Sequence, residues 1–307
     1  MTWRKSDQTI PLDQQKVPAV CPPGVDWINP NAVESYTPLG TPLDSAQVNP
    51  FRLTDRLRML AEEAGATFCT RRKVTKIIYS PNNKSVTAIE YQTGTQTKSL
   101  WVDDLIIAAG PWSPTLLPQL RMGHPHSHSI IYRTPYTFSA HVLFPIYEQE
   151  NATAHMGGPF PELYPRPADS LYEFPTVYAC GPDDNAAPLP ETSRDVQVDT
   201  KAIGELAKAV RAVLDVAVAA TAAKGEPMVK QACYKPQLKP HGEGQEVGPA
   251  VGPVRGVKGL WVATGHDEWG VSNGPGTGLV MAEWLLEGEP KSLVGDGSVL
   301  DPMRWMG

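Results

Sequence analysis

The sequence has few of the features that mark secreted, membrane-spanning or nucleic-acid-binding proteins. Only four cysteines occur in 307 residues, and their positions (Cys21, Cys69, Cys180 and Cys233) show no paired spacing. The opening "MTWRKSDQT" also lacks the apolar run of a secretion signal. We therefore expect a reducing, cytoplasmic setting.

Long apolar runs and basic stripes are also absent. The most apolar helical stretch, "AVRAVLDVAVAATAA", is interrupted by Asp215 and falls short of the roughly 20 apolar residues that a membrane span needs. The net charge of -6 comes from mixed charges, with no cluster of lysine and arginine that would neutralise phosphates. We expect no membrane span, no nucleic-acid partner and a small-molecule substrate.

The composition and the periodic patterns divide the chain into four segments. Residues 1–49 are rich in proline and turn residues and form an irregular lead-in. Residues 50–123 begin with an amphipathic helix at Pro50 that Gly65 ends, followed by short alternating segments typical of an antiparallel meander. In residues 124–224, strands separated by proline-rich loops precede a helix, which predicts an inserted lobe, and residues 225–307 return to the first lobe.

Two apolar segments share one pattern. "DLIIAAG" at 104–110 and "GLWVATG" at 259–265 are continuous apolar runs that end in Ala-x-Gly. Such runs are typical of strands buried on both faces. We expect the two strands to be neighbours in one sheet, with their carboxyl ends meeting at a ligand.

A glycine-rich loop follows the second of these strands. It ends in "GPGTG" at 274–278, and "TGLVMAEWLLEG" predicts a helix that begins near Thr277 and stops at Gly288. The N-terminus of that helix would favour an anionic or electron-rich group, such as a flavin ring or a phosphate, and glycine lets the backbone approach it closely. A tight turn with no ligand explains the glycines equally well.

These segments resemble the D-amino-acid-oxidase-like FAD-dependent oxidoreductases. The resemblance rests on "DLIIAAGPWSP" and "GLWVATGHDEWGVSNGPGTGLVMAEWLLEG", and "CYKPQ" is similar to oxidoreductases of fungi and yeasts whose substrates are largely unassigned. It implies an α/β fold with an inserted α+β lobe: an FAD-binding, Rossmann-like lobe and an antiparallel-sheet substrate lobe. It also implies FAD as cofactor and hydride transfer from an amine or amino-acid-like substrate to the flavin.

The resemblance also implies roles for individual residues. Cofactor contacts would come from Val74, Ala109, Gly110, Trp112, Gly265, His266, Asp267, Glu268, Gly270, Gly276, Thr277 and Gly278. Catalytic or substrate-facing candidates are His266, Trp269, Tyr234 and Lys239. Cys233 falls near where some relatives attach FAD covalently, and a small buried residue is its other interpretation. For Lys239 and His266, the alternatives are a solvated lysine and a histidine bound to loop backbone.

The sequence departs from the family in two respects. It contains no Gly-x-Gly-x-x-Gly turn between a strand and a helix, so the first βαβ unit that holds the pyrophosphate is missing. The stretch at Val271 and Ser272 also lacks the lysine that assists oxygen activation in sarcosine-oxidase-like members. We expect an N-terminally incomplete form of an FAD-dependent oxidoreductase. The alternative is a non-catalytic remnant, a scaffold or interaction protein that no longer binds FAD.

Two further groups of residues are open to more than one interpretation. His124, His126 and His128 alternate and could share one side of an extended chain, but a polar entry to a strand explains them without a metal, and we predict no metal site. Loss of the first βαβ unit should expose one side of the two apolar strands. We expect either a protein partner or the lead-in residues Val17, Val20, Val25, Trp27 and Ile28 to cover that side.

Overall fold

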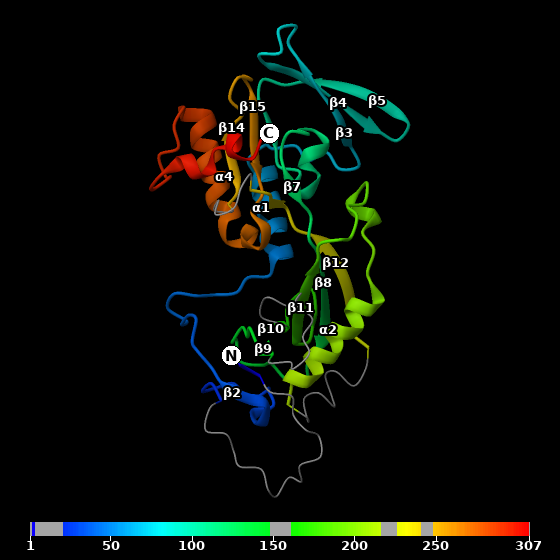
Figure 1. The fold of residues 1–307 in the computed structure, drawn as a ribbon, viewed down its shortest axis with the longest axis vertical. Coiled ribbons are helices and arrows are strands. Elements are labelled where there is room, and N and C mark those ends of the chain that lie inside the picture. Colours follow the sequence, from blue (N-terminus) through cyan, green and yellow to red (C-terminus); the bar gives the residue numbers. More distant parts are fainter. Residues whose placement is uncertain (1, 4–20, 148–160, 216–225, 241–247, 307) are drawn as a thin grey trace, which may run out of the picture. The chain divides into compact units, whose positions relative to one another are not determined.

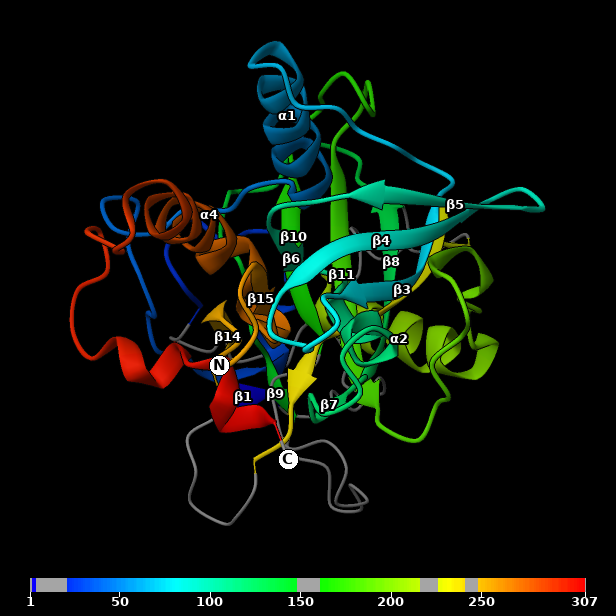
Figure 2. The same cartoon turned by 90° about the horizontal axis from the view of Figure 1, so that it is seen from above.

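The computed structural model describes residues 2–3, 21–147, 161–215, 226–240 and 248–306 (Figures 1 and 2). The chain divides into two compact units, each built from two separate segments. The first unit comprises Met1–Gln47 and His126–Cys233, and the second comprises Val48–Pro125 and Tyr234–Gly307. Within the described part of the chain, no helix is both long enough and apolar enough to cross a membrane.

The first unit is organised around a four-stranded sheet with the strand order β10-β11-β8-β12. Both β10 and β8 run antiparallel to β11. This sheet is the antiparallel sheet that the sequence predicted for the middle of the chain. The elements of this unit are β1 (Thr2–Trp3), η2 (Pro30–Ala32), β2 (Val33–Ser35), β8 (His126–Arg133), β9 (Ile146–Tyr147), β10 (Glu162–Arg166), β11 (Thr176–Asp184), η4 (Ser193–Asp195), α2 (Thr200–Val213) and β12 (Val229–Tyr234).

One face of this sheet forms the core of the first unit. Ile130, Leu163 and Val177 are buried and pack with apolar residues of α2. Asp199 begins α2 by accepting hydrogen bonds from the backbone N–H groups of Lys201 and Ala202. Figure 1 shows α2 lying along β8 and β11, so the helix covers the apolar face of the sheet.

The lead-in residues complete this same core. Trp27 is fully buried, stacks on Phe138 with ring centroids 4.9 Å apart, and donates its indole N–H to Ser139 Oγ at 3.0 Å. Val25 and Ile28 are buried in the same cluster. We had expected these residues to cover the apolar strands of the other unit, and that expectation is wrong because the first unit buries them. Val17 and Val20 lie outside the described residues.

In its described residues, the second unit contains three small sheets, with strand orders β3-β4-β5, β14-β15-β6 and β13-β7. Figure 2 shows β3, β4 and β5 side by side as the predicted antiparallel meander. The elements of this unit are α1 (Pro50–Glu63), β3 (Lys73–Tyr79), β4 (Val86–Thr93), β5 (Gln96–Trp101), β6 (Leu105–Ile107), η3 (Gly110–Thr115), β7 (Met122–Gly123), β13 (Gln237–Leu238), β14 (Ala250–Pro253), β15 (Leu260–Thr264), η5 (Asp267–Trp269), α4 (Gly270–Glu287), η6 (Gly297–Leu300) and η7 (Pro302–Trp305).

The two apolar strands are neighbours, as predicted. Strand β6 pairs in parallel with β15, and Leu105 is opposite Leu260. Parallel pairing brings the carboxyl ends of both strands to the same edge of the sheet. Ile107, Leu260 and Val262 are buried in the core of this unit, whereas Ile106 is 41% exposed.

Helix α1 begins where the sequence predicted. Asn49 caps its N-terminus, accepting hydrogen bonds from the backbone N–H groups of Phe51 and Arg52, and Pro50 occupies the first turn. None of its residues is buried, and Phe51 is 65% exposed. The apolar side chains of α1 are therefore not packed in the core of the second unit.

Several sequence-based assignments are wrong. Segments 66–70 and 138–144 were expected to be strands, but 66–70 is irregular and 138–144 contributes only an isolated bridge from Leu143 to Leu163. Strand β10 was not predicted, and β13 and β14 lie in what was expected to be one long loop. Strands β10 and β14 were not predicted because they contain Pro165 and Pro253, and proline argues against a central strand.

Candidate functional site

The carboxyl ends of β6 and β15 are tied together by hydroxyl groups. Ser113 Oγ donates to the carbonyl of Gly110 at 2.7 Å and lies 3.4 Å from Thr264 Oγ1, which is itself 3.3 Å from the same carbonyl. Ser113 and Thr264 are both buried. The two loops that leave this edge of the sheet are thus held in a fixed relation to each other.

Gly265 is required by the packing of the protein itself. Its φ of +84° is a left-handed conformation that favours glycine. A Cβ at this position would lie 2.4 Å from Leu238 Cδ1, which is far too close. The glycine therefore lets β13 approach the end of β15.

His266 connects the loop to helix α4. Its Nε2 lies 2.8 Å from Thr277 Oγ1. Burial lowers the pKa of the His266 imidazole, so the neutral ring is favoured at neutral pH. The predicted site residues His266 and Thr277 are thus brought together in a single contact.

Asp267 is held in an unusual position. Its φ is +50°, a conformation that costs energy for a residue with a side chain. Its backbone N–H donates to the carbonyl of Pro236 at 3.0 Å, and Gln237 Nε2 donates to its Oδ2 at 2.9 Å. Its Oδ1 is buried and has no hydrogen-bond partner in the described protein. A buried acceptor of this kind is available for a donor that the described chain does not supply.

Helix α4 begins earlier than predicted. The sequence suggested a glycine loop up to Gly278, but Gly274, Gly276, Thr277 and Gly278 lie inside a helix that starts at Gly270. None of the three glycines has a positive φ, so each adopts an ordinary helical conformation. The prediction was wrong because glycine and proline were interpreted as loop residues, whereas the η5 turn leads directly into the helix.

Gly274 and Gly278, four residues apart, form an exposed strip on one face of α4, whereas Gly276 lies on the opposite side of the helix. Gly274, Gly276 and Gly278 are exposed, and a Cβ built at any of them would find no neighbouring atom within 4 Å. No side chain caps the N-terminus of α4. In a helix interior each glycine costs about 1 kcal/mol relative to alanine. Neither backbone strain nor internal packing therefore explains this strip.

Other predicted residues lie around the loop without meeting in a single cluster. Glu268 is exposed and pairs with Lys235 Nζ at 3.5 Å, and Trp269 is 63% exposed. The ring of Tyr234 lies 6.1 Å from that of His124. Lys239 is exposed, and its side chain runs past Gly123.

The remaining predicted residues are more scattered. Val74 pairs with Tyr91 in the meander, and Ala109 accepts a hydrogen bond from the backbone N–H of Trp112 at 3.1 Å. Ala109 is exposed, which leaves its surface accessible at the end of β6. Cys233 is the last residue of the first unit and is exposed, which contradicts its interpretation as a small buried residue.

The three alternating histidines are divided between the two units. His126 and His128 are buried, with ring centroids 4.4 Å apart, and His128 Nε2 accepts the backbone N–H of Asp199 at 2.9 Å. Burial, with a smaller effect from His126, lowers the pKa of His128. Among the described residues, no three side chains of histidine, cysteine, aspartate or glutamate are grouped so as to hold a metal ion.

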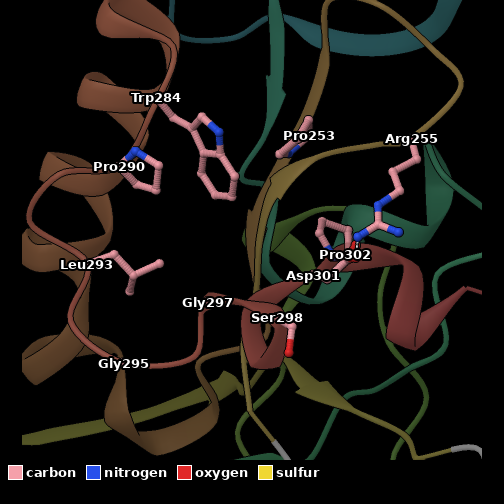
Figure 3. A pocket seen from close by; sticks show the side chains of 10 residues that line it. All are labelled: Pro253, Arg255, Trp284, Pro290, Leu293, Gly295, Gly297, Ser298, Asp301 and Pro302. Carbon is pink, nitrogen blue, oxygen red and sulfur yellow. Dashed lines mark ion pairs between the residues drawn. The ribbon is translucent and has the colours of Figure 1, made fainter.

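Two hollows lie beside α4. A narrow apolar hollow of about 160 Å³ separates α1 from the start of α4 and is lined by Leu53, Leu57, Gly270, Val271 and Gly274, among others. A larger hollow of about 480 Å³ lies beside the C-terminal segment, where Figure 3 shows Trp284 extending from α4 and Arg255 paired with Asp301. None of the predicted site residues is among those that line the larger hollow.

Sequence reasoning missed three polar residues that organise this region. Ser113 and Thr264 join the strand ends, and Gln237 holds the carboxylate of Asp267. Thr264 could have been noticed as the one hydroxyl residue between two small residues at the end of an apolar strand. Ser113 and Gln237 carry no such signal, because their partners are 151 and 30 residues away in the sequence.

Known proteins are similar to this chain in sequence. A protein of Schizosaccharomyces pombe named "Putative oxidoreductase C1F5.03c" is 29% identical over 98% of this chain and 74% of its own length. A protein of Saccharomyces cerevisiae named "Putative oxidoreductase TDA3" is 27% identical over 96% of this chain, which spans only 58% of that protein.

Solved structures show the same fold. Glycine oxidase from Bacillus cereus matches with a TM-score of 0.56 and 19% identity, covering 77% of this chain and 55% of that one. L-proline dehydrogenase from P. horikoshii matches with a TM-score of 0.58 and 14% identity, covering 83% of this chain and 59% of that one. The profile of the DAO family, "FAD dependent oxidoreductase", matches residues 14–284. With most of its length matched, this chain belongs to the FAD dependent oxidoreductase (DAO) family.

Proposed function

We propose that this chain binds the ring end of FAD at the edge where β6 and β15 end, and that it takes part in oxidising an amine or amino-acid-like substrate. The family is FAD-dependent. The observation that carries the proposal is the exposed strip of Gly274 and Gly278 on one face of α4, which the fold itself does not require. A flat ring packed against a helix needs such a surface, because side chains would hold it away.

The residues present fit the ring end of the cofactor. The uncapped N-terminus of α4 favours an electron-rich group, and the buried Oδ1 of Asp267 can accept a hydrogen bond. His266, held by Thr277, stays neutral and close to the glycine strip. The sequence has no Gly-x-Gly-x-x-Gly turn, so these residues account for ring contacts and not for pyrophosphate contacts.

When bound, FAD supplies the acceptor for a hydride taken from a carbon next to nitrogen. The chain's own residues would orient the reactants and limit water. The contact of His266 with Thr277 and that of Gln237 with Asp267 fix the loop, and the apolar hollow beside Gly270 and Gly274 leaves few polar groups to hold water. Related solved structures include a glycine oxidase and an L-proline dehydrogenase, which is why we propose an amino-acid-like substrate.

The test is titration of the purified chain with FAD, followed by flavin absorption and fluorescence, with variants of the glycine strip. Gly278→Leu should weaken FAD binding at least about tenfold, because its side chain would occupy the ring surface. Gly278→Ala should weaken binding less and raise the free energy of unfolding by about 1 kcal/mol, because alanine favours the helix.

The matched control is Gly204→Ala. Gly204 lies exposed inside α2, and a Cβ there would also meet nothing within 4 Å. This variant should gain similar stability and leave FAD binding unchanged. FAD binding that is equal in the wild type and in Gly278→Leu would show that the ring does not pack on this strip.

A second candidate function, a non-catalytic interaction protein, is favoured by exposed apolar residues in the second unit. Ile106 on β6 is 41% exposed, and Phe51 on α1 is 65% exposed. Such residues can be covered by a protein partner. A folded wild-type chain that fails to bind FAD at any concentration would favour this function over the oxidoreductase.

A further inference from the structure

The larger hollow beside α4, which we call the C-terminal hollow, is lined largely by apolar rings. Trp284, Pro253, Pro290 and Pro302 contribute these rings, and Leu293 lies among them. The volume of about 480 Å³ falls within the roughly 300–1,000 Å³ that is usual for binding sites. The family profile ends at residue 284, so the part of the wall formed by residues 290–302 lies beyond the family match. The hollow is therefore a feature separate from the proposed FAD site.

The ring of Trp284 is packed directly against strand β14. Gly252 in this strand has a φ of +135°, and a Cβ at this position would lie only 3.0 Å from Trp284 Cζ3. Glycine thus lets the ring lie on the backbone of β14. Trp261 supports the same ring from its edge, with centroids 6.2 Å apart and an interplanar angle of 64°. Because Trp284 is only half-buried, it offers the hollow an aromatic surface whose position is already fixed.

The polar side chains of the C-terminal hollow offer mainly hydrogen-bond donors. Arg255 pairs with Asp301 Oδ2 at 2.5 Å, but 73% of its side chain is exposed, and its other N–H groups form no hydrogen bond with the described residues. The indole N–H of Trp284 also donates no hydrogen bond within the described chain. The carboxylate of Asp301 already has a second partner, because Oδ1 accepts the backbone N–H of Met303 at 3.0 Å. A ligand of this hollow would therefore supply acceptors.

Exposed apolar side chains continue from the hollow along the C-terminal segment. Val294 follows the lining residue Leu293 and is 94% exposed. Val299 and Met303, which follow the lining residues Ser298 and Pro302, are exposed as well. Exposed apolar side chains grouped in this way mark a surface that another protein covers. An extended peptide that runs beyond the hollow fits this surface better than a small molecule enclosed within it.

We propose that the C-terminal hollow binds a proline-rich segment of a partner protein in the polyproline II conformation. Such segments dock on grooves lined by aromatic rings, which Trp284 provides. Their backbone has no internal hydrogen bonds, so its carbonyl groups need donors, and proline has no N–H that needs an acceptor. The N–H groups of Trp284 and Arg255 supply those donors. This inference goes beyond the proposed function and does not depend on FAD.

The test compares a proline peptide with a flexible peptide of equal length. The full-length chain is titrated by calorimetry with acetylated, amidated decaproline and with a ten-residue Gly-Ser peptide. The dissociation constant for decaproline should be below about 1 mM, and the Gly-Ser peptide should bind at least about tenfold more weakly, because it lacks both the rings and the extended backbone. A weaker dissociation constant for decaproline, or an equal affinity for the two peptides, would overturn the proposal.

Two variants each remove one donor from the hollow. Trp284→Phe keeps a ring on Gly252 but removes the indole N–H, so the affinity for decaproline should fall by about threefold to tenfold. Arg255→Met should lower the affinity by a similar factor, and it covers the case in which Trp284→Phe does not fold, because an exposed ion pair contributes little to stability. An affinity that either variant leaves unchanged would contradict the assignment of the peptide to this hollow.

The matched controls are Trp101→Phe and Arg56→Met. Trp101 in β5 is 80% exposed, and Arg56 on α1 forms an exposed ion pair with Glu63 at 3.4 Å. Neither residue lines the hollow, so both variants should keep the full affinity for decaproline. An equal loss in the controls and in the two hollow variants would overturn the proposal.

The indole N–H signals of the tryptophans give a second readout by NMR. The signal that is absent from the spectrum of Trp284→Phe belongs to Trp284, and the signal of Trp101 is identified in the same way. Decaproline should shift the Trp284 signal of the wild type more than the Trp101 signal, because the Trp284 N–H gains an acceptor. A larger shift at Trp101 would show that the peptide binds elsewhere and would overturn the proposal.

Discussion

Both units have a buried apolar core, but the second exposes more large apolar side chains than the first. In the first unit, Trp27, Leu163 and Val210 are fully buried between the sheet, α2 and the lead-in. In the second unit, α1 has no buried residue, and Ile106 on β6 is exposed. The second unit thus presents apolar residues at the region where we propose that FAD binds. A fold that leaves such a surface uncovered is adapted to contact something outside the described chain.

The largest expected effect tests the core of the first unit. Trp27→Ala should lower the free energy of unfolding of the first unit by about 3–5 kcal/mol, because it removes a fully buried ring and its stacking on Phe138. Urea unfolding followed by circular dichroism would measure the change. Trp101→Ala is the control, since Trp101 in β5 is 80% exposed and its loss should cost below about 1 kcal/mol. Equal costs would show that burial of Trp27 does not stabilise the first unit.

A smaller effect concerns the two histidines whose pKa values burial lowers, His128 in the first unit and His266 in the second. A histidine with a folded pKa below its unfolded value of about 6.5 binds protons more readily when unfolded. Stability is therefore full above that pH and falls as the pH drops below it. Protonation of His128 also removes the acceptor for the N–H of Asp199 at the start of α2.

Thermal unfolding between neutral and mildly acidic pH would measure this loss. His128→Gln and His266→Gln should each flatten the acid-side decline, because each removes one proton-binding group. A decline that no single variant alters would mean that other groups control the pH dependence.

The smallest expected effect tests the exposed surface of the second unit. Phe51→Ser on α1 should change the free energy of unfolding by no more than about 0.5 kcal/mol, because the side chain is 65% exposed. It should also reduce the binding of a dye that reports exposed apolar surface. A loss of several kcal/mol would show that Phe51 is covered in solution, and the contrast between the two units would then fail.

The sequence by itself determined the elements whose signals are local. Pro50 after Asn49 marked the start of α1, and the apolar runs at 105–107 and 260–264 predicted two neighbouring strands. The alternation in the meander predicted its antiparallel sheet. The glycine strip was found as a motif, together with the family that its wording resembles. Capping, periodicity and alternation act between residues close in the chain, so they can be read directly.

Only the tertiary structure decided the rest. It assigned Trp27 to the core of the first unit, joined Ser113 to Thr264 across 151 positions, and set Trp284 against Gly252. It also showed that Gly276 lies within a helix, because α4 begins at Gly270, directly after the η5 turn. These features depend on which strands pair and on which faces pack together. The free energy of such long-range contacts cannot be read from any short stretch of sequence, because the contacting residues are far apart in the chain.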